Sequence, residues 1–462
     1  MTSRTSRVGR SSTPWPVARL PATPRDGAGE GGDGSRDGWV VALTPCDALR
    51  ADLDAAGLPE PLPADESARW EAWLQVATVF DRLRRLPRRH RAAHAARTGP
   101  VWALAREVSG EARFEAVAEV MAAWPARGEA PALPAFRELL WGMEQVEAAG
   151  ATRLALSGLA ALAALVPVGD LRAGYAIAQR GRALRTIGAV TEAARAFQDA
   201  RQVGDRCADE WLVCRCLLGQ GAIAHVRGNY PAAREAFSEV LKRSPAAPEL
   251  VLGAHHGLLS AAVTARNFDQ GLGHGIEAIR LTTAHPESRR ETLCAIGTLC
   301  EEMGDARAAR GAYELALRMA PRPHQRPFLL RTCLQLSMLL DEASTASEYA
   351  ALLQTQLLHT HNPYDRAASL QVLGSWYSWG GNAASCREAA AAALAIAEER
   401  GYFEIAYKAA DLLHQRTPAV HGEGARGRPT SELSSDLSAS SLVLLTHLTD
   451  SSPHLACAAP SD

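Results

Sequence analysis

The sequence predicts an all-α fold, a solenoid of antiparallel helical hairpins with disordered termini. Aromatic residues make up only 6% of the 462-residue chain, whereas Ala and Leu are abundant, and this composition favours helices over strands. No segment alternates apolar and polar residues over several positions, so no half-buried strand is indicated. A ten-residue pattern that opens with glycine recurs along the middle of the chain. Repeated helical units of this kind bury their apolar faces by stacking on one another.

Composition divides the chain into soft ends and a helical middle. Residues 1–62 are rich in Gly, Pro, Ser and Arg, and residues 416–462 have a similar composition, so we expect both to be disordered tails. Residues 63–135 read as a helical N-terminal segment that caps or extends the solenoid. Residues 136–415 carry the repeat and form the predicted solenoid domain.

The N-terminal segment shows helical periodicity before the repeat begins. Trp70, Trp73, Ala77 and Phe80 follow one another at intervals of three and four residues, which predicts one face of a helix over 65–86. Gly and Pro punctuate the segments that follow. The further helices that we expect in this part of the chain cover 100–108, 111–124, 133–148 and 151–166.

The repeat is the most informative pattern. Five windows align in register, namely GATRLALSGL (150–159), GAVTEAARAF (188–197), GNYPAAREAF (228–237), GDARAARGAY (304–313) and GNAASCREAA (381–390). Their first glycines are separated by 38, 40, 76 and 77 residues, so the last two intervals are double steps. Degenerate units are therefore expected near 251–288 and 327–362, and about seven units run from about 136 to 402.

Each repeated position has a physical reason. The opening glycine suits a turn in which the backbone is left-handed, and an Asn or Asp directly after it can cap the second helix. Positions five, nine and twelve residues after the glycine are small, bulky and apolar, and they share one stripe of that helix. A small residue seven positions before the glycine lets the two helices approach closely. The bulky residue, exemplified by Phe197, Phe237 and Tyr313, fills the gap to the next unit.

These residues resemble the tetratricopeptide repeat, with 290–323 and 214–247 as the best units. The resemblance covers roughly 270 of the 462 residues, and the spacing of about 38 exceeds the usual value of about 34. Longer helices are typical of repeats in bacterial sensor and regulator proteins of this class. The resemblance implies a right-handed superhelix whose first helices line a concave groove, which binds a protein or peptide partner.

The same resemblance places side chains three and six residues before each turn glycine in the groove. The groove candidates, with two neighbours on the same surface, are Glu144, Glu147, Tyr175, Arg182, Arg185, Arg215, His225, His256, Ser260, Thr298 and Glu301. Paired arginines bind carboxylates or phosphates in a fork, and Arg and Tyr are frequent binding hot spots. The competing interpretation is that these residues only keep an exposed helix face charged.

An arginine-rich segment at 82–97 is the second candidate surface. Its basic patch consists of Arg82, Arg84, Arg85, Arg88, Arg89 and Arg91. Neither interleaved aromatic residues nor a helix-turn-helix context accompanies it, so we do not expect nucleic acid as a partner. The alternative to a simple scaffold or adaptor is nevertheless a bacterial regulatory or sensor protein, in which this segment contacts nucleic acid or an output partner.

Nothing in the sequence indicates catalysis. Nucleotide-binding loops and nucleophile elbows are absent, and Cys214 and Cys216 point in different directions on one predicted helix. The pairs His255–His256 and His359–His361, with His274, lack a carboxylate partner and are interpreted as packing or surface residues. We therefore expect no enzymatic activity, no metal and no cofactor.

Charge and cysteine content are typical of a soluble intracellular chain. The 49 basic and 51 acidic residues nearly balance, which excludes a wholesale basic coat for nucleic acid. Nine scattered cysteines form no disulfide framework. No apolar stretch reaches the length that spans a bilayer, so a cytoplasmic location without a membrane span is expected. The sequence leaves the oligomeric state open.

Overall fold

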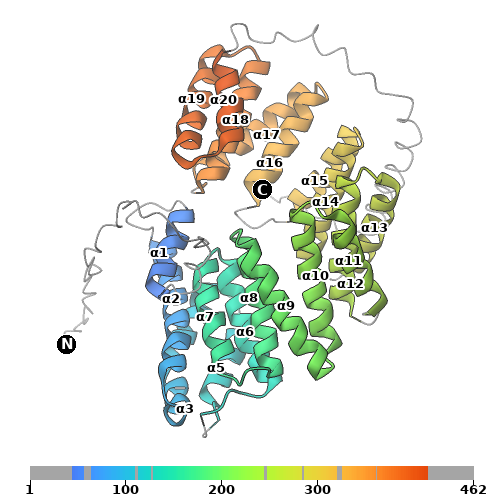
Figure 1. Cartoon of the computed structure of the whole chain (residues 1–462). Helices are drawn as coiled ribbons and strands as arrows, with labels where there is room; N and C mark the ends of the chain where they lie inside the picture. Colours follow the sequence, from blue (N-terminus) through green and yellow to red (C-terminus); the bar gives the residue numbers. More distant parts are fainter. Residues whose placement is uncertain are drawn as a thin grey trace, which may run out of the picture.

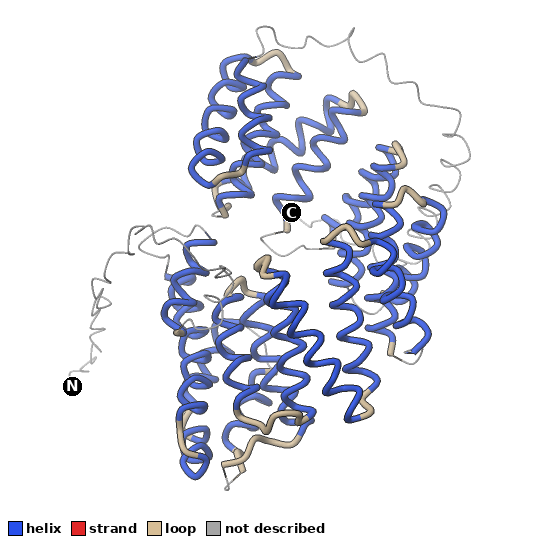
Figure 2. The backbone as a smooth tube through the Cα atoms, in the orientation of Figure 1, coloured by secondary structure: helices blue, strands red, loops and turns tan. Residues whose placement is uncertain are grey.

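Helices are the only regular elements in the part of the chain that the structure describes. The computed structural model describes residues 44–56, 64–109, 113–125, 128–243, 247–282, 286–319, 325–360 and 362–414. Figure 2 shows this region as helices joined by short turns. The predicted all-α class is confirmed. The expected disorder at 1–43 and 416–462 lies outside the described residues.

Seven consecutive helix pairs form the body of the molecule. The first helices of these pairs are α6 (Leu133–Ala148), α8 (Leu171–Thr186), α10 (Glu210–Val226), α12 (Pro248–Thr264), α14 (Pro286–Glu302), α16 (Arg326–Leu339) and α18 (Pro363–Trp379). The second helices are α7 (Thr152–Ala164), α9 (Val190–Cys207), α11 (Tyr230–Arg243), α13 (Phe268–Leu281), α15 (Ala306–Arg318), α17 (Ala343–Leu357) and α19 (Ala383–Arg400). Each first helix begins 37 to 40 residues after the previous one. Figure 1 shows the pairs following an arc from the teal α6 to the red α19.

Six further helices flank the pairs. They are α1 (Pro45–Ala56), α2 (Ala64–Arg85), α3 (Arg88–Ala96), α4 (Gly99–Ser109) and α5 (Phe114–Ala122) on the N-terminal side, and α20 (Phe403–His414) on the C-terminal side. α2 packs along α7 and covers the end of the array. The expectation of a structureless segment over all of 1–62 is wrong, because α1 is a helix that packs on α2 and α7.

The predicted turn glycines are left-handed. Gly150, Gly188, Gly228, Gly304 and Gly381 all have φ between 75° and 92°, at the junction of the two helices of a pair. This conformation is cheap for glycine because it has no Cβ.

The two degenerate units keep the same turn without glycine. Arg266 (φ 55°) and Asp341 (φ 57°) occupy the corresponding junctions. A left-handed residue with a side chain is strained by about 1–2 kcal/mol. Stacking of the neighbouring helices therefore imposes the turn where the local sequence does not favour it.

Predicted caps follow three of the turns. The side chain of Asp305 accepts a hydrogen bond from the backbone N–H of Ala308 over 3.0 Å. Asn382 accepts one from Ser385 over 3.1 Å, and Asn229 accepts one from Ala232 over 3.3 Å. These bonds satisfy amide groups in the first turn of the second helix, which otherwise have no partner within the helix.

The large rings of the second helices fill spaces left by glycines. A Cβ built on Gly221 would lie 2.7 Å from the ring of Phe237, and one built on Gly257 would lie 2.5 Å from it. Gly221 belongs to the same helix pair as Phe237, and Gly257 belongs to the next. Phe197 has the same relationship to Gly181 and Gly219. The bulky residue therefore joins successive pairs, as the repeat pattern predicts.

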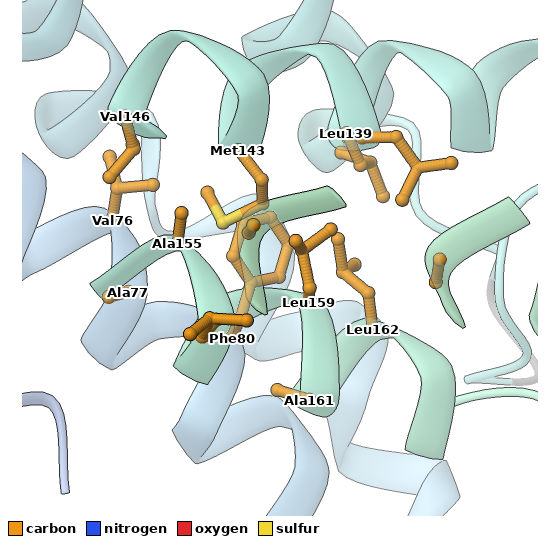
Figure 3. Close-up of a cluster of buried hydrophobic side chains, with 14 of the residues drawn as sticks. Val76, Ala77, Phe80, Leu139, Met143, Val146, Ala155, Leu159, Ala161 and Leu162 are labelled. Carbon is orange, nitrogen blue, oxygen red and sulfur yellow. The ribbon is translucent and has the colours of Figure 1, made fainter. Parts of the chain in front are cut away.

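The N-terminal end of the array has a continuous apolar core (Figure 3). Three helices supply its centre, with Val76, Ala77 and Phe80 from α2, Leu139, Met143 and Val146 from α6, and Ala155, Leu159 and Leu162 from α7. All nine side chains are buried. This core holds α6 rigidly, and α6 carries one wall of the groove described next.

Candidate binding groove

A cavity of about 740 Å³ opens along the first helices of five successive pairs. Its wall is supplied by α6, α8, α10, α12 and α14, with Arg113 at the start of α5 completing one end. No residue of a second helix lines it. Because first helices lie side by side at regular intervals, each of them contributes side chains from one face. The cavity is therefore a consequence of the repeat.

Five of the eleven predicted groove residues meet in this cavity, namely Glu144, Tyr175, Arg182, Arg215 and His256. Thr298 lies instead in an adjoining cavity of about 430 Å³, whose wall also includes His256. The other five are absent from the walls of both cavities.

Those five residues make local contacts elsewhere. The hydroxyl of Ser260 donates to the carbonyl oxygen of His256, and His225 contacts the hydroxyl of Thr264 over 3.1 Å. Burial raises the pKa of Glu301. Glu147 and Arg185 flank Arg182 at the end of the cavity wall.

An aromatic and arginine ladder forms one side of the cavity. Tyr175 stacks on Trp211 with ring centroids 5.3 Å apart and planes 5° from parallel. The Arg137 guanidinium lies 4.7 Å from the centre of the Tyr175 ring and also donates a hydrogen bond to its hydroxyl. The Tyr175 hydroxyl is 3.2 Å from the carboxylate of Asp209, to which it donates. Arg137 and Trp211 were not predicted as groove residues.

A period-based signal could have revealed the missed residues. Arg137 contacts Tyr175, and Trp211 donates from its indole N–H to Glu249 over 2.8 Å; both pairs are separated by 38 residues. That separation equals one repeat. Complementary side chains one period apart on first helices therefore mark neighbours in the wall, and such pairs can be found in the sequence alone.

Arg182 is held by two carboxylates. Its Nη2 lies 3.0 Å from Glu144 Oε1 and 2.9 Å from Glu147 Oε2. Burial raises the pKa of Glu147, and the charge of Arg182 opposes that rise. The Nε of Arg182 is buried and has no hydrogen-bond partner. One donor of this guanidinium is therefore left unsatisfied by the protein.

Arg215 differs from the other arginines of the wall. Among the residues that the structure describes, no hydrogen bond or ion pair to its guanidinium is present, whereas Arg113, Arg137 and Arg182 each have a partner. Burial lowers the pKa of Arg215, and the nearby positive charge of Arg182 lowers it further. Arg215 is only partly exposed, and it lines the cavity.

Catalytic or metal chemistry has little support in the described residues. No group of three or more potential metal-ligating side chains occurs among them. His255 and His274 do meet, with their Nδ1 atoms 3.1 Å apart, but burial lowers the pKa of each. Cys216 is buried, and desolvation raises the pKa of its thiol to about 12, so the nucleophilic thiolate is disfavoured.

The arginine-rich segment spans the end of α2 and most of α3. Asp81 pairs with Arg84 and Arg85 at 2.9 and 2.8 Å, which offsets part of the positive charge. Arg88 and Arg89 are exposed in the first turn of α3. The structure therefore leaves a smaller free basic surface than the sequence suggests.

Comparisons with known proteins leave the assignment to the structure itself. No protein-family model matches the sequence, and no curated protein matches it. The solved structure of aspartyl phosphate phosphatase F from Bacillus subtilis is 11% identical, with a TM-score of 0.38 over 79% of this chain and 98% of that chain. A circular tandem repeat protein is 13% identical, with a TM-score of 0.13 over 88% of this chain and 90% of its own. Both TM-scores are low, so neither likeness carries a functional argument.

The seven stacked helix pairs decide the class. The chain is a helical repeat protein. Within the described residues, no helix is long and apolar enough to cross a membrane.

Proposed function

We propose that this helical repeat protein is a non-catalytic scaffold or adaptor of the tetratricopeptide type, which acts in the cytoplasm and binds an extended peptide segment of a protein partner in its groove. The observation that carries this proposal is the cavity of about 740 Å³ along five first helices. An elongated site with a regular wall suits an extended chain, whose side chains also recur at fixed intervals.

The chemistry of the wall supports the same function. Trp141, Tyr175 and Trp211 offer rigid aromatic surfaces that can bury apolar side chains at low entropic cost. Glu249 and Gln179 lie beside them and can bond to the amide and carbonyl groups of a peptide backbone. Aromatic anchors beside arginines are the typical composition of a binding hot spot.

Selection from a displayed random peptide library tests the proposal directly. The full chain is used as bait, and the affinities of the selected peptides are then measured with two variants. Leu252→Trp narrows the cavity, because Leu252 lies in its wall. Gln198→Trp adds the same ring on the exposed face of α9, outside the cavities described here.

We expect the selected peptides to bind Leu252→Trp at least about tenfold more weakly than the unmodified chain, a loss of about 1.4 kcal/mol. Binding to Gln198→Trp should be unchanged. Equal affinities for all three proteins, or failure to select any peptide, would contradict the proposal. Circular dichroism confirms beforehand that both variants are folded.

The alternative function is that of a bacterial regulatory or sensor protein whose 82–97 segment contacts nucleic acid or an output partner. Its support is the exposure of Arg88 and Arg89 in the first turn of α3. Fluorescence anisotropy with duplex DNA at low salt would show binding that is lost in the Arg88→Ser/Arg89→Ser variant and at higher salt. Absence of binding at low salt would remove this alternative.

A further inference from the structure

We propose that Arg215 anchors a carboxylate-binding subsite in the groove, where it receives a single carboxylate of the peptide ligand. This inference rests on the proposed function, because it names the group by which the ligand is recognised. The carboxylate comes either from an acidic side chain or from the C-terminus of the peptide.

The first argument is the missing partner of Arg215. Burying an arginine without a hydrogen-bond acceptor is unfavourable, and folded proteins usually pair such a group. Arg113 pairs with Glu138, and Arg182 with Glu144, yet Arg215 has no such contact with the described residues. Because Arg215 lines the cavity, an acceptor can reach it from that side.

The second argument is the position of Arg182 nearby. The positive charges of Arg182 and Arg215 repel each other, which shows in the lowered pKa of Arg215. Arg182 also has a buried Nε without a hydrogen-bond partner. An anion at Arg215 would relieve the repulsion, and in a partly desolvated site this interaction is stronger than in water.

The third argument concerns the charge that the subsite accepts. The cavity wall carries four arginines and three glutamates, the latter being Glu144, Glu249 and Glu291. One positive charge is therefore in excess, which suits a monoanion. A dianionic phosphate would place a second negative charge near these glutamates. Burial also lowers the pKa of His256, so this ring stays neutral at neutral pH and adds no positive charge.

A small probe tests the subsite without any knowledge of the peptide. 3-Phenylpropionate combines a carboxylate with a ring that can rest on the Tyr175–Trp211 stack. Its amide, 3-phenylpropanamide, has the same shape without the charge, and phenyl phosphate supplies a dianion. Each compound is titrated into the full-length chain by isothermal titration calorimetry at neutral pH.

We expect 3-phenylpropionate to bind at least about tenfold more tightly than either the amide or phenyl phosphate, as a charge-assisted hydrogen bond predicts. Arg215→Gln should abolish this preference, and Arg215→Lys should restore part of it, since lysine keeps the charge and loses the fork. The matched control is Arg195→Gln, which removes an exposed arginine from α9 and should change nothing. Equal binding of acid and amide, or an unchanged preference in Arg215→Gln, would overturn the proposal. Tighter binding of phenyl phosphate would instead refute the selection of a monoanion.

Peptides separate this inference from the proposed function. For each selected peptide, we compare the native form with one in which the acidic side chains are amides and one in which the C-terminus is amidated. Loss of affinity in one form, seen with the unmodified chain and absent in Arg215→Gln, identifies the source of the carboxylate. Peptides that bind in the groove and are indifferent to both changes would refute the subsite and leave the proposed function intact. Probe binding at Arg215 without any selectable peptide would refute the proposed function instead.

Discussion

The backbone N–H of Leu154 donates a hydrogen bond to Asp52 Oδ2 over 3.0 Å, across a sequence separation of 102 residues. The N–H of Arg153 donates to the same oxygen over 2.8 Å, and the Arg153 guanidinium contacts Oδ1. The N-cap residue of α7 is Ala151, whose side chain cannot accept such bonds. A carboxylate from α1 therefore caps α7 and also complements the positive end of its dipole.

Removal of this cap should destabilise the N-terminal core. Asp52→Ala leaves two amides of α7 without an acceptor in a buried setting, and we expect the free energy of unfolding to fall by about 2 kcal/mol. Urea denaturation followed by tryptophan fluorescence measures the change. Asp54→Ala, in an exposed position on α1, is the control and should have no comparable effect. Equal stability of the two variants would show that the contact contributes nothing.

Two glycine-to-alanine substitutions should act in opposite directions. Gly221→Ala would place a Cβ 2.7 Å from the ring of Phe237, and we expect a loss of about 1–3 kcal/mol from overpacking. Gly273→Ala, in α13, meets no atom within 4 Å, and we expect a gain of about 1 kcal/mol from helix propensity. Thermal unfolding of both variants compares them. A stabilising Gly221→Ala would mean that Phe237 does not depend on this space.

The left-handed turns allow a second test of the repeat. Arg266→Gly should stabilise the protein by about 1 kcal/mol, since the strain at φ 55° is relieved. Part of this gain is offset by loss of the contact between Arg266 and the Phe268 ring, 5.8 Å away. Conversely, Gly304→Ala should cost about 1–2 kcal/mol although no atom lies within 4 Å of the added Cβ. Differential scanning calorimetry distinguishes this backbone effect from packing, and a neutral Gly304→Ala would argue against it.

Acid should destabilise the α12–α13 pair through two histidines. The Nδ1 atoms of His255 and His274 lie 3.1 Å apart, and burial lowers the pKa of both rings. A lowered pKa means that the unfolded chain takes up protons before the folded chain does. The free energy of unfolding should therefore fall as the pH drops below about 6.5, the ordinary value for histidine. Urea titrations at about pH 7.5 and about pH 5.5 measure this loss.

The variant His274→Gln should reduce that pH dependence, because it removes one of the two groups and the repulsion between them. His90→Gln, in an exposed position on α3, is the matched control and should retain the full dependence. An undiminished acid loss in His274→Gln would assign the effect to other groups.

Features that depend on neighbours close in the sequence could be predicted from it. The turn at Gly228 and the cap at Asn229 involve a few adjacent residues, and both occur as expected. The helix around Trp73 and Phe80 was recognisable because its apolar spacing repeats over several turns. The contact of Phe237 with glycines on two first helices was also predictable, because stacking repeats the same contact in successive pairs.

Features that depend on distant residues were not predictable in the same way. α1 is surrounded by residues of disorder-like composition, and its Asp52 gains partners only when α7 is beside it. Arg266 adopts a glycine-like conformation because its two helices are already packed against their neighbours. Tertiary packing supplies the stabilising free energy that the local sequence lacks.

The sequence by itself determined the helical class, the repeat and the identity of the helices that line the groove, because these follow from short-range periodicity. Only the tertiary structure decided how the charges pair. Arg182 is engaged by Glu144 and Glu147, while Arg215 faces the cavity without such a partner among the described residues. The pairing of charges depends on distances between neighbouring first helices, and a linear pattern records which residues share a face without recording those distances.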